Sequence, residues 1–154
     1  MKKMILIIAV FILSFLSYAQ EYQPAKKFDP TKNPFQDLKN AIEYAQKTNK
    51  RILLDVGGEW CIWCHRLDSF IESHKEIKEY LEKHFVVVKV NYSKENKNEK
   101  FLSEYPEIKG YPHFFVLDKD GKFLHSQDTG LLEKDKDYDE NKFMQFLEKW
   151  AIKN

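Results

Sequence analysis

Cysteine is almost absent from this chain: of its 154 residues, only Cys61 and Cys64 are cysteines. Exported domains usually spend their cysteines on bridges between distant segments. A pair three residues apart closes no long loop, so this sequence contains no framework of structural disulfides. Because such a short-range bond adds little stability, it is better suited to being broken and remade, which indicates redox chemistry.

An excess of charge of either sign is also lacking. The chain has 25 Lys and Arg against 24 Asp and Glu, and it shows no internal repeats. A nearly balanced charge implies neither a nucleic-acid-binding patch nor a strongly acidic surface. We therefore expect no nucleic-acid partner.

The one long hydrophobic run lies at the N-terminus. Lys2 and Lys3 precede an almost unbroken apolar run over residues 4–15, and residues 17–19 (Ser-Tyr-Ala) place small residues at both cleavage-determining positions. This pattern predicts a secretory signal peptide over residues 1–19, cleaved near Ala19. An uncleaved membrane anchor is the alternative, but the run is shorter than the ~20 residues that a spanning helix needs. No cysteine follows the cleavage site to carry a lipid, so we expect an exported protein, periplasmic or secreted.

Removal of residues 1–19 from the 154 leaves 135, a length that suits one domain. The mature chain is close to neutral, with 23 basic against 24 acidic residues. Residues 20–34 contain three prolines and predict an extended N-terminal arm that packs little. The folded domain is expected over residues 35–154.

Hydrophobic periodicity alternates between helix and strand along this domain. Helical spacing predicts helices over 35–49, 61–71 and 139–152, and a further helix that ends near His84 and begins with a capping box of Ser73 and Glu76. Short apolar runs predict strands over 51–56 and 85–91, the second of them central and parallel. Asp120-Gly121 predicts a hairpin between strands 113–118 and 122–127, after a weakly helical stretch over 94–105. This order of elements indicates a single α/β sandwich.

Together with five local features, this order resembles the thioredoxin fold over roughly residues 35–154. Trp60-Cys61-x-x-Cys64 begins a helix after a buried strand, and Asp55 lies where thioredoxins place a buried carboxylate. Lys89 matches the lysine that faces that carboxylate, Gly110-Tyr111-Pro112 matches the cis-proline loop, and Gly130 matches a glycine of the substrate groove. The chain is similar to exported thioredoxin-like domains and to the reducing C-terminal domain of membrane thiol-disulfide interchange proteins. The resemblance implies a central mixed β-sheet of four or five strands flanked by helices.

The sequence departs from the thioredoxin pattern at three places. Ile62 and Trp63 stand between the cysteines in place of Gly and Pro, so the redox potential cannot be transferred from thioredoxin. The first strand of the fold is not evident in residues 20–34, and the long helix after the cysteines is split near Ser73.

The position of the cysteines at a helix start predicts their roles. The helix dipole and the free N–H groups of the first turn favour an anion, which lowers the pKa of the first thiol. Cys61 is therefore expected to attack as a thiolate, and Cys64 to resolve the mixed disulfide. The alternatives are a static surface disulfide and a zinc site. Zinc needs about four ligands, and only Cys61, Cys64 and His65 or His113 would be near.

Asp55 stands in the middle of an apolar strand, and burying a carboxylate without a partner costs several kcal/mol. Either Lys89 or a raised pKa must relieve that cost, and a raised pKa makes Asp55 a proton acceptor for Cys64. The alternative is an Asp that simply caps the Gly57-Gly58 loop.

Aromatic residues and the proline loop predict a substrate groove around Cys61. Trp60, Tyr111 and Gly130 are expected to form it, and a cis bond before Pro112 would turn backbone groups toward the cysteines. For Trp60 the alternative is core packing. Trp63 is expected to cover the active-site surface, and His65 to act electrostatically on the pair, with an exposed helix histidine as the alternative.

These features predict an exported thiol-disulfide oxidoreductase. It is expected to work as a monomer and to need no cofactor beyond its own dithiol and no metal. Its expected partners are disulfide-bearing exported proteins and a membrane-embedded electron donor or acceptor. Because no histidine stands between the cysteines to stabilise the thiolate, a reductant or reducing relay is favoured over an oxidant. The alternative is a thioredoxin-fold binding module whose cysteines are incidental or load metal.

Overall fold

The computed structural model describes residues 22–153, so the predicted signal peptide lies outside the part that can be assessed. Four strands form one sheet in the order β2-β1-β3-β4. β1 (Arg51–Gly57) pairs in parallel with β2 (Phe85–Asn91) and antiparallel with β3 (His113–Leu117). β4 (Phe123–Asp128) completes the sheet antiparallel to β3. The predicted mixed sheet is confirmed, with four strands.

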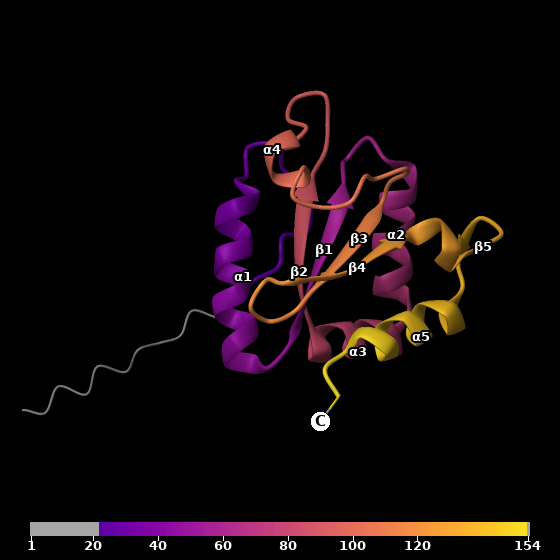
Figure 1. Cartoon of the computed structure of the whole chain (residues 1–154). Helices are drawn as coiled ribbons and strands as arrows, with labels where there is room; N and C mark the ends of the chain where they lie inside the picture. The colour runs from indigo at the N-terminus through magenta and orange to yellow at the C-terminus, as the bar shows by residue number, and fades with distance from the viewer. Residues whose placement is uncertain (1–21, 154) are drawn as a thin grey trace, which may run out of the picture.

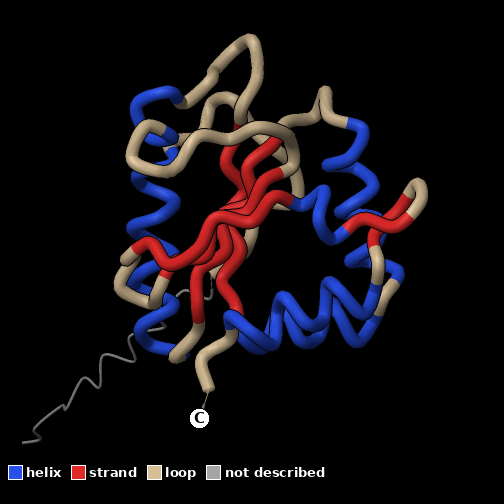
Figure 2. The backbone as a smooth tube through the Cα atoms, turned by 45° about the vertical axis from the view of Figure 1, so that its right-hand side comes forward, coloured by secondary structure: helices blue, strands red, loops and turns tan. Residues whose placement is uncertain are grey.

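Helices cover both faces of this sheet (Figures 1 and 2). α1 (Pro34–Thr48) and the short α4 (Glu99–Leu102) pack on one face, whereas α2 (Ile62–Ser73), α3 (Lys75–His84) and α5 (Glu140–Trp150) pack on the other. Side chains alternate along a strand, so Leu53 of β1 enters the core under α2, α3 and α5. Its neighbours Ile52 and Leu54 enter the core under α1. β1 is therefore buried from both sides.

A short connection that the sequence did not predict links β4 to α5. It consists of the 3-10 turn η1 (Thr129–Leu132) and a hairpin of β5 (Glu133–Lys134) and β6 (Asp137–Tyr138). Strands of two residues are too short to show a period, so no pattern could have indicated them.

The capping box predicted from Ser73 and Glu76 is wrong. α3 follows an N-cap at His74 that makes no side-chain capping bond. Ser73 is the last residue of α2, and its hydroxyl donates to the Phe70 carbonyl oxygen at 3.1 Å. Because His74 alone separates the two helices, Ser73 stays helical and its side chain turns back on its own helix.

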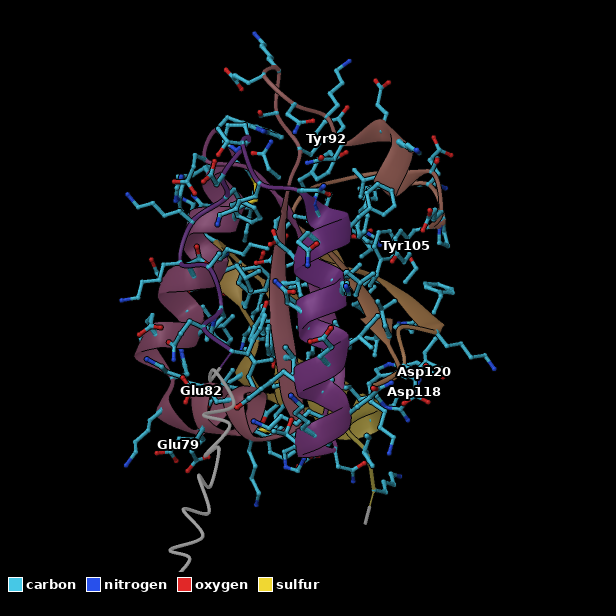
Figure 3. All side chains as sticks on the ribbon, turned by 90° about the vertical axis from the view of Figure 1, so that its left-hand side faces the viewer. Glu79, Glu82, Tyr92, Tyr105, Asp118 and Asp120 are labelled. Atoms are coloured by element: carbon cyan, nitrogen blue, oxygen red, sulfur yellow. A yellow bond between two sulfur atoms is a disulfide. The ribbon has the colours of Figure 1, made fainter. Side chains whose placement is uncertain are left out.

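The N-terminal arm lies against the domain and is attached to it by the aromatic residues Tyr22 and Phe28. In Figure 3 it runs between α1 and the α2–α3 pair, in front of β2. The Tyr22 hydroxyl donates to the Val87 carbonyl oxygen of β2 at 2.9 Å, and Phe28 is only 3% exposed. Residues 23–27 and 31–33 of the arm are exposed, whereas the burial of Phe28 was not predicted. Among residues 22–153, no helix has the length and apolar character needed to cross a membrane.

Candidate active site

The two cysteines lie where the loop after β1 enters α2. They form a disulfide, and both are buried, at 4% and 1% exposed. Cys61 is the N-cap of α2, and its Sγ accepts a hydrogen bond from the backbone N–H of Cys64 at 3.1 Å. A donor aimed at this sulfur and the helix N-terminus both stabilise negative charge there. This geometry favours a thiolate on Cys61 when the pair is reduced.

Gly57, the last residue of β1, brings the strand against the second cysteine. A Cβ placed on this glycine would lie 2.5 Å from Cys64 Sγ and 3.0 Å from Cζ of the Phe28 ring. Only glycine leaves room for this approach. Asp55, two residues earlier on the strand, lies on the same side of the sheet as Gly57. The Asp55 carboxylate is therefore on the side where α2 carries Cys64.

Asp55 belongs to a group of three charges, of which Asp55 and Lys89 are largely buried and Asp68 is partly exposed. Lys89 Nζ lies 2.9 Å from Asp55 Oδ2 and 2.8 Å from Asp68 Oδ1. Burial raises the pKa of Asp55 above its usual value, although Lys89 opposes this and Asp68 adds to it. Burial alone would lower the pKa of Lys89, but the two carboxylates raise it.

Within the described part of the chain, the second carboxylate oxygen of Asp55 has no hydrogen-bond partner. Asp55 therefore does not cap the Gly57-Gly58 loop, because its one bonded oxygen faces Lys89. Both ways of relieving the buried charge, the lysine and the raised pKa, operate together. Sequence reasoning missed Asp68, and one acidic residue on a helix with several charged positions carries no signal that could have indicated it.

An aromatic surface adjoins the disulfide on its exposed side. Trp60 is 59% exposed, so the core-packing alternative for it is wrong. Its Nε1 donates to the Tyr92 carbonyl oxygen at 2.7 Å, and its ring contacts Tyr111 edge-on at 5.8 Å between centroids. The ring of Tyr111 in turn stacks on that of Tyr92 at 4.6 Å. The Tyr111–Pro112 peptide bond is cis, as predicted.

Gly130 lies in η1, beside the residue that ties this turn to the proline loop. Thr129 is buried, and its hydroxyl donates to the Pro112 carbonyl oxygen at 2.6 Å. The Gly130 N–H donates to Asp128 Oδ1 at 2.9 Å. The bond from Thr129 therefore joins the turn that contains Gly130 to the proline loop.

Trp63 packs sideways along α2. Its ring lies edge-on against Tyr138 at 5.7 Å, and the Arg66 guanidinium lies 4.5 Å from its centroid. It also contacts the cluster that contains both cysteines. Trp63 thus covers one side of the cysteine pair while being held by its own neighbours.

The two histidines near the site differ in burial. His65 is exposed, and its Nε2 shares a hydrogen bond with the Glu59 carbonyl oxygen at 2.7 Å. His113 is 5% exposed, its Nε2 lies 2.8 Å from Ser126 Oγ, and burial lowers its pKa. Across residues 22–153, no group of three or more His, Cys, Asp and Glu side chains is arranged to hold a metal ion. The zinc alternative therefore lacks a ligand set in this part of the chain.

Comparison with known proteins places these features in a family. The model of the family described as Thioredoxin-like matches residues 33–119, more than half of the chain. The disulfide bond reductase DsbH of Chlamydia pneumoniae is 28% identical over 93 residues, which cover 54% of this chain and 55% of that protein. The match thus spans about half the length of that curated relative.

Solved structures agree with the fold. A disulphide isomerase from Xylella fastidiosa Temecula1 superposes with a TM-score of 0.68 and 26% identity, covering 79% of this chain and 94% of that one. The oxidised C-terminal domain of DsbD from Neisseria meningitidis superposes with a TM-score of 0.56 and 23% identity over 82% of this chain and all of that domain, which supports the fold. The chain belongs to the thioredoxin-like family, and it carries the cysteine pair with which the thiol-disulfide oxidoreductases of that family work.

Proposed function

We propose that this chain is an exported thiol-disulfide oxidoreductase that reduces disulfides in other exported proteins. The observation that carries the proposal is the position of Cys61 as the N-cap of α2, with its sulfur accepting the Cys64 N–H. Similarity to a disulfide bond reductase and to a disulphide isomerase supports it. Export is supported by the signal-peptide pattern of residues 1–19.

The first step uses the reduced protein. The Cys61 thiolate attacks one sulfur of a substrate disulfide, so a bond forms between Cys61 Sγ and that sulfur while the substrate S–S bond breaks. The other substrate sulfur leaves as a thiolate. The N–H of Cys64 and the N-terminus of α2 lower the free energy of the attacking anion.

The second step releases the substrate. Cys64 loses its proton to Asp55, whose pKa is raised by burial, which makes its carboxylate a stronger base. The Cys64 thiolate then attacks Cys61 Sγ, the mixed disulfide breaks, and the second substrate sulfur leaves as a thiolate. The substrate has gained two electrons, and the protein is left with the Cys61–Cys64 disulfide that the structure shows.

The cycle closes when a dithiol donor reduces this disulfide by the same two exchanges in reverse. We assign that role to a membrane-embedded thiol-disulfide carrier. Substrate docks on Trp60, Tyr111, Pro112 and Gly130, where an extended segment can add to the backbone of the proline loop. Lys89 supports catalysis by holding Asp55, Trp63 covers the side of the pair, and His65 acts on it from the next turn of α2.

Insulin reduction tests the proposal directly. With dithiothreitol as donor, the protein should accelerate precipitation of the insulin B chain, and Cys61→Ser should abolish that acceleration. Cys64→Ser should accumulate mixed disulfides with insulin, visible on a non-reducing gel. A binding module would leave the rate unchanged in the wild type, and equal rates in wild type and Cys61→Ser would refute the enzyme assignment.

A further inference from the structure

One side chain of the N-terminal arm reaches the centre of the active site. Phe28 is 3% exposed and packs in a cluster with Cys61 and Cys64. Its ring lies on the Gly57 side of Cys64, since a Cβ on Gly57 would meet both that ring and Cys64 Sγ. Phe28 belongs to no hydrophobic periodicity in the sequence, and the resemblance to thioredoxins begins only after the arm. Neither could therefore have indicated this residue.

The same ring also faces the buried charges. Lys89 Nζ lies 4.2 Å from the centroid of the Phe28 ring, and this is the ammonium that bonds Asp55. Phe28 therefore contacts the resolving cysteine on one side and the partner of the proton acceptor on the other. A cation against an aromatic face is itself a favourable contact.

Two bonds hold the arm in this place. The Phe28 N–H donates to Glu59 Oε1 at 2.9 Å, and Glu59 lies in the loop just before the cysteines. The Asn96 side-chain amide donates to the Pro30 carbonyl oxygen at 2.8 Å. Both anchors come from the folded domain, so the ring is fixed from both ends of its segment.

A cleft opens onto the buried charges beside this ring, although Phe28 itself does not line it. A cleft of about 690 Å³ runs beneath residues 22–26 of the arm and is lined by Asp55, Asp68 and Lys89. Neither cysteine lines this cleft. Phe28 stands between the part of the site that the cleft opens and the part that contains Cys64.

We propose that Phe28 is a positioning residue for the resolving step, sealing the space between Cys64 and the Asp55–Lys89 pair against water from the cleft. The proposal rests on the proposed function and deepens it, because the arm becomes part of the active site. The ring keeps water out of the space between the Asp55 carboxylate and Cys64, and a carboxylate that is poorly solvated on that side is the stronger base. Attack by Cys61 on substrate takes place on the side of Trp60 and Tyr111, away from the space that Phe28 seals, and does not depend on this seal.

The pKa of Asp55 depends on the charged groups that face it. They are Lys89 on β2 and Asp68 on α2, and Tyr138 on β6 also senses its charge, while Cys64 lies on the same side of the sheet. Of these, Phe28 contacts Lys89 and Cys64. Substituting Phe28 therefore alters the solvation of the group while leaving every charged side chain in place.

Ellman's disulfide, 5,5′-dithiobis(2-nitrobenzoate), separates the two steps. Attack by Cys61 on this probe releases one thionitrobenzoate, and resolution by Cys64 releases the second as the Cys61–Cys64 disulfide forms. Stopped-flow absorbance then gives both rate constants for the purified protein between pH 5 and 9. The matched control is Phe35→Ala, which removes a 39% exposed aromatic side chain that contacts Phe101 and does not belong to the cysteine cluster.

Phe28→Ala should slow the second release about tenfold at pH 7, which is a partial loss of the about 100- to 10,000-fold that a well-placed general base supplies. It should also move the acid limb of that step to lower pH, because a hydrated Asp55 has a lower pKa. The first release and the Phe35→Ala profile should stay within about twofold of the wild type. Phe28→Leu, which fills part of the space without offering a ring face to Lys89, should shift the limb in the same direction by less.

The proposal is overturned if Phe28→Ala releases the second thionitrobenzoate at the wild-type rate and with the acid limb at the wild-type pH. If Phe28→Ala does not fold by circular dichroism, Phe28→Leu decides alone, and an unshifted acid limb in that variant overturns it equally. Failure of the proposed function has a different signature, since a wild-type protein that cannot release the second thionitrobenzoate or reduce insulin lacks the activity altogether.

Discussion

Asp55 and Lys89 hold the same register position on the parallel strands β1 and β2, and their side chains meet at 2.9 Å in the core. Lys89 also bonds Asp68, so one ammonium is shared between two carboxylates. The charge of Asp55 is therefore only partly compensated, and its pKa is raised by burial despite the lysine. This gives a buried group that can take up a proton next to a thiol-disulfide pair.

Asp55→Asn should slow resolution by Cys64 and leave attack by Cys61 unchanged. The amide cannot accept the thiol proton, so the second release from Ellman's disulfide should fall at least about a hundredfold at pH 7. The same substitution at Asp135, an exposed residue of the β5–β6 turn, is the matched control. Wild-type rates for Asp55→Asn from pH 6 to 8 would make Asp55 a structural residue only.

The same variant should be more stable at neutral pH. Because the folded protein binds the Asp55 proton more tightly than the unfolded chain, stability falls as pH rises from about 3.8 through the raised pKa. Asp55→Asn removes this loss, and Lys89 keeps Asp68 as its partner. We expect Tm to rise by about 4 °C at pH 7, equivalent to ~1 kcal/mol. The gain should vanish near pH 4, and a gain that persists there would contradict the assignment.

Gly57→Ala should destabilise the protein, whereas Gly110→Ala should not. The new methyl group at Gly57 would lie 2.5 Å from Cys64 Sγ, while nothing lies within 4 Å of a Cβ at Gly110. Overpacking of this kind costs about 1–3 kcal/mol, and a change at an open site stays within about 0.5 kcal/mol. Thermal unfolding of the two variants measures the difference, and equal Tm values would show that β1 does not pack closely against Cys64.

The order of the main elements and the cysteine pair could be predicted because each leaves a local pattern. β2 is a run of β-branched residues, and Cys61 and Cys64 are the only cysteines. The facing of Asp55 and Lys89 came from the resemblance, since no local pattern pairs residues on two strands. The structure brings them together because β1 and β2 are in parallel register.

Phe28 and Asp68 could not be predicted, for two different reasons. Phe28 is a single apolar residue in an arm that has no period, and its burial depends on the hollow left beside Gly57. In the sequence, Asp68 looks like any solvated charge on α2, and its role comes only from the ion pair with Lys89 of β2. Both residues act through tertiary contacts that a sequence pattern does not record.

Trp60→Ala should weaken substrate binding more than turnover. The ring is 59% exposed and is held by its bond to Tyr92 and its contact with Tyr111. Losing such an aromatic contact is worth about 1 kcal/mol, so KM for insulin should rise about fivefold with kcat within twofold. Trp60→Phe keeps an aromatic face, so its KM for insulin should lie between those of the wild type and Trp60→Ala. An unchanged KM would place the docking surface elsewhere.

The redox potential of the pair should lie near the reducing end of the range for this fold. Ile62 and Trp63 place no charge between the cysteines, and His65 acts on them only from outside the pair, where its Nε2 shares a hydrogen bond with the Glu59 carbonyl oxygen. The thiolate of Cys61 is therefore stabilised mainly by the N-terminus of α2, which favours a potential nearer about −270 mV than the about −120 mV of strong oxidants. Redox titration against glutathione measures it, and a value more oxidising than about −180 mV would contradict the reductant assignment.

Ile62→His should make this potential less negative, that is, more oxidising. Ile62 is 62% exposed, so the substitution disturbs little packing, and an imidazolium beside Cys61 stabilises the thiolate and hence the reduced form. We expect a shift of about 30 mV, a tenfold change in the equilibrium constant, with Ile62→Gln as the uncharged control. Because an imidazole loses its charge above a pKa of about 6.5, the shift should be larger at pH 6 than at pH 8. Equal potentials for the two variants at pH 6 would mean that charge between the cysteines does not set the potential.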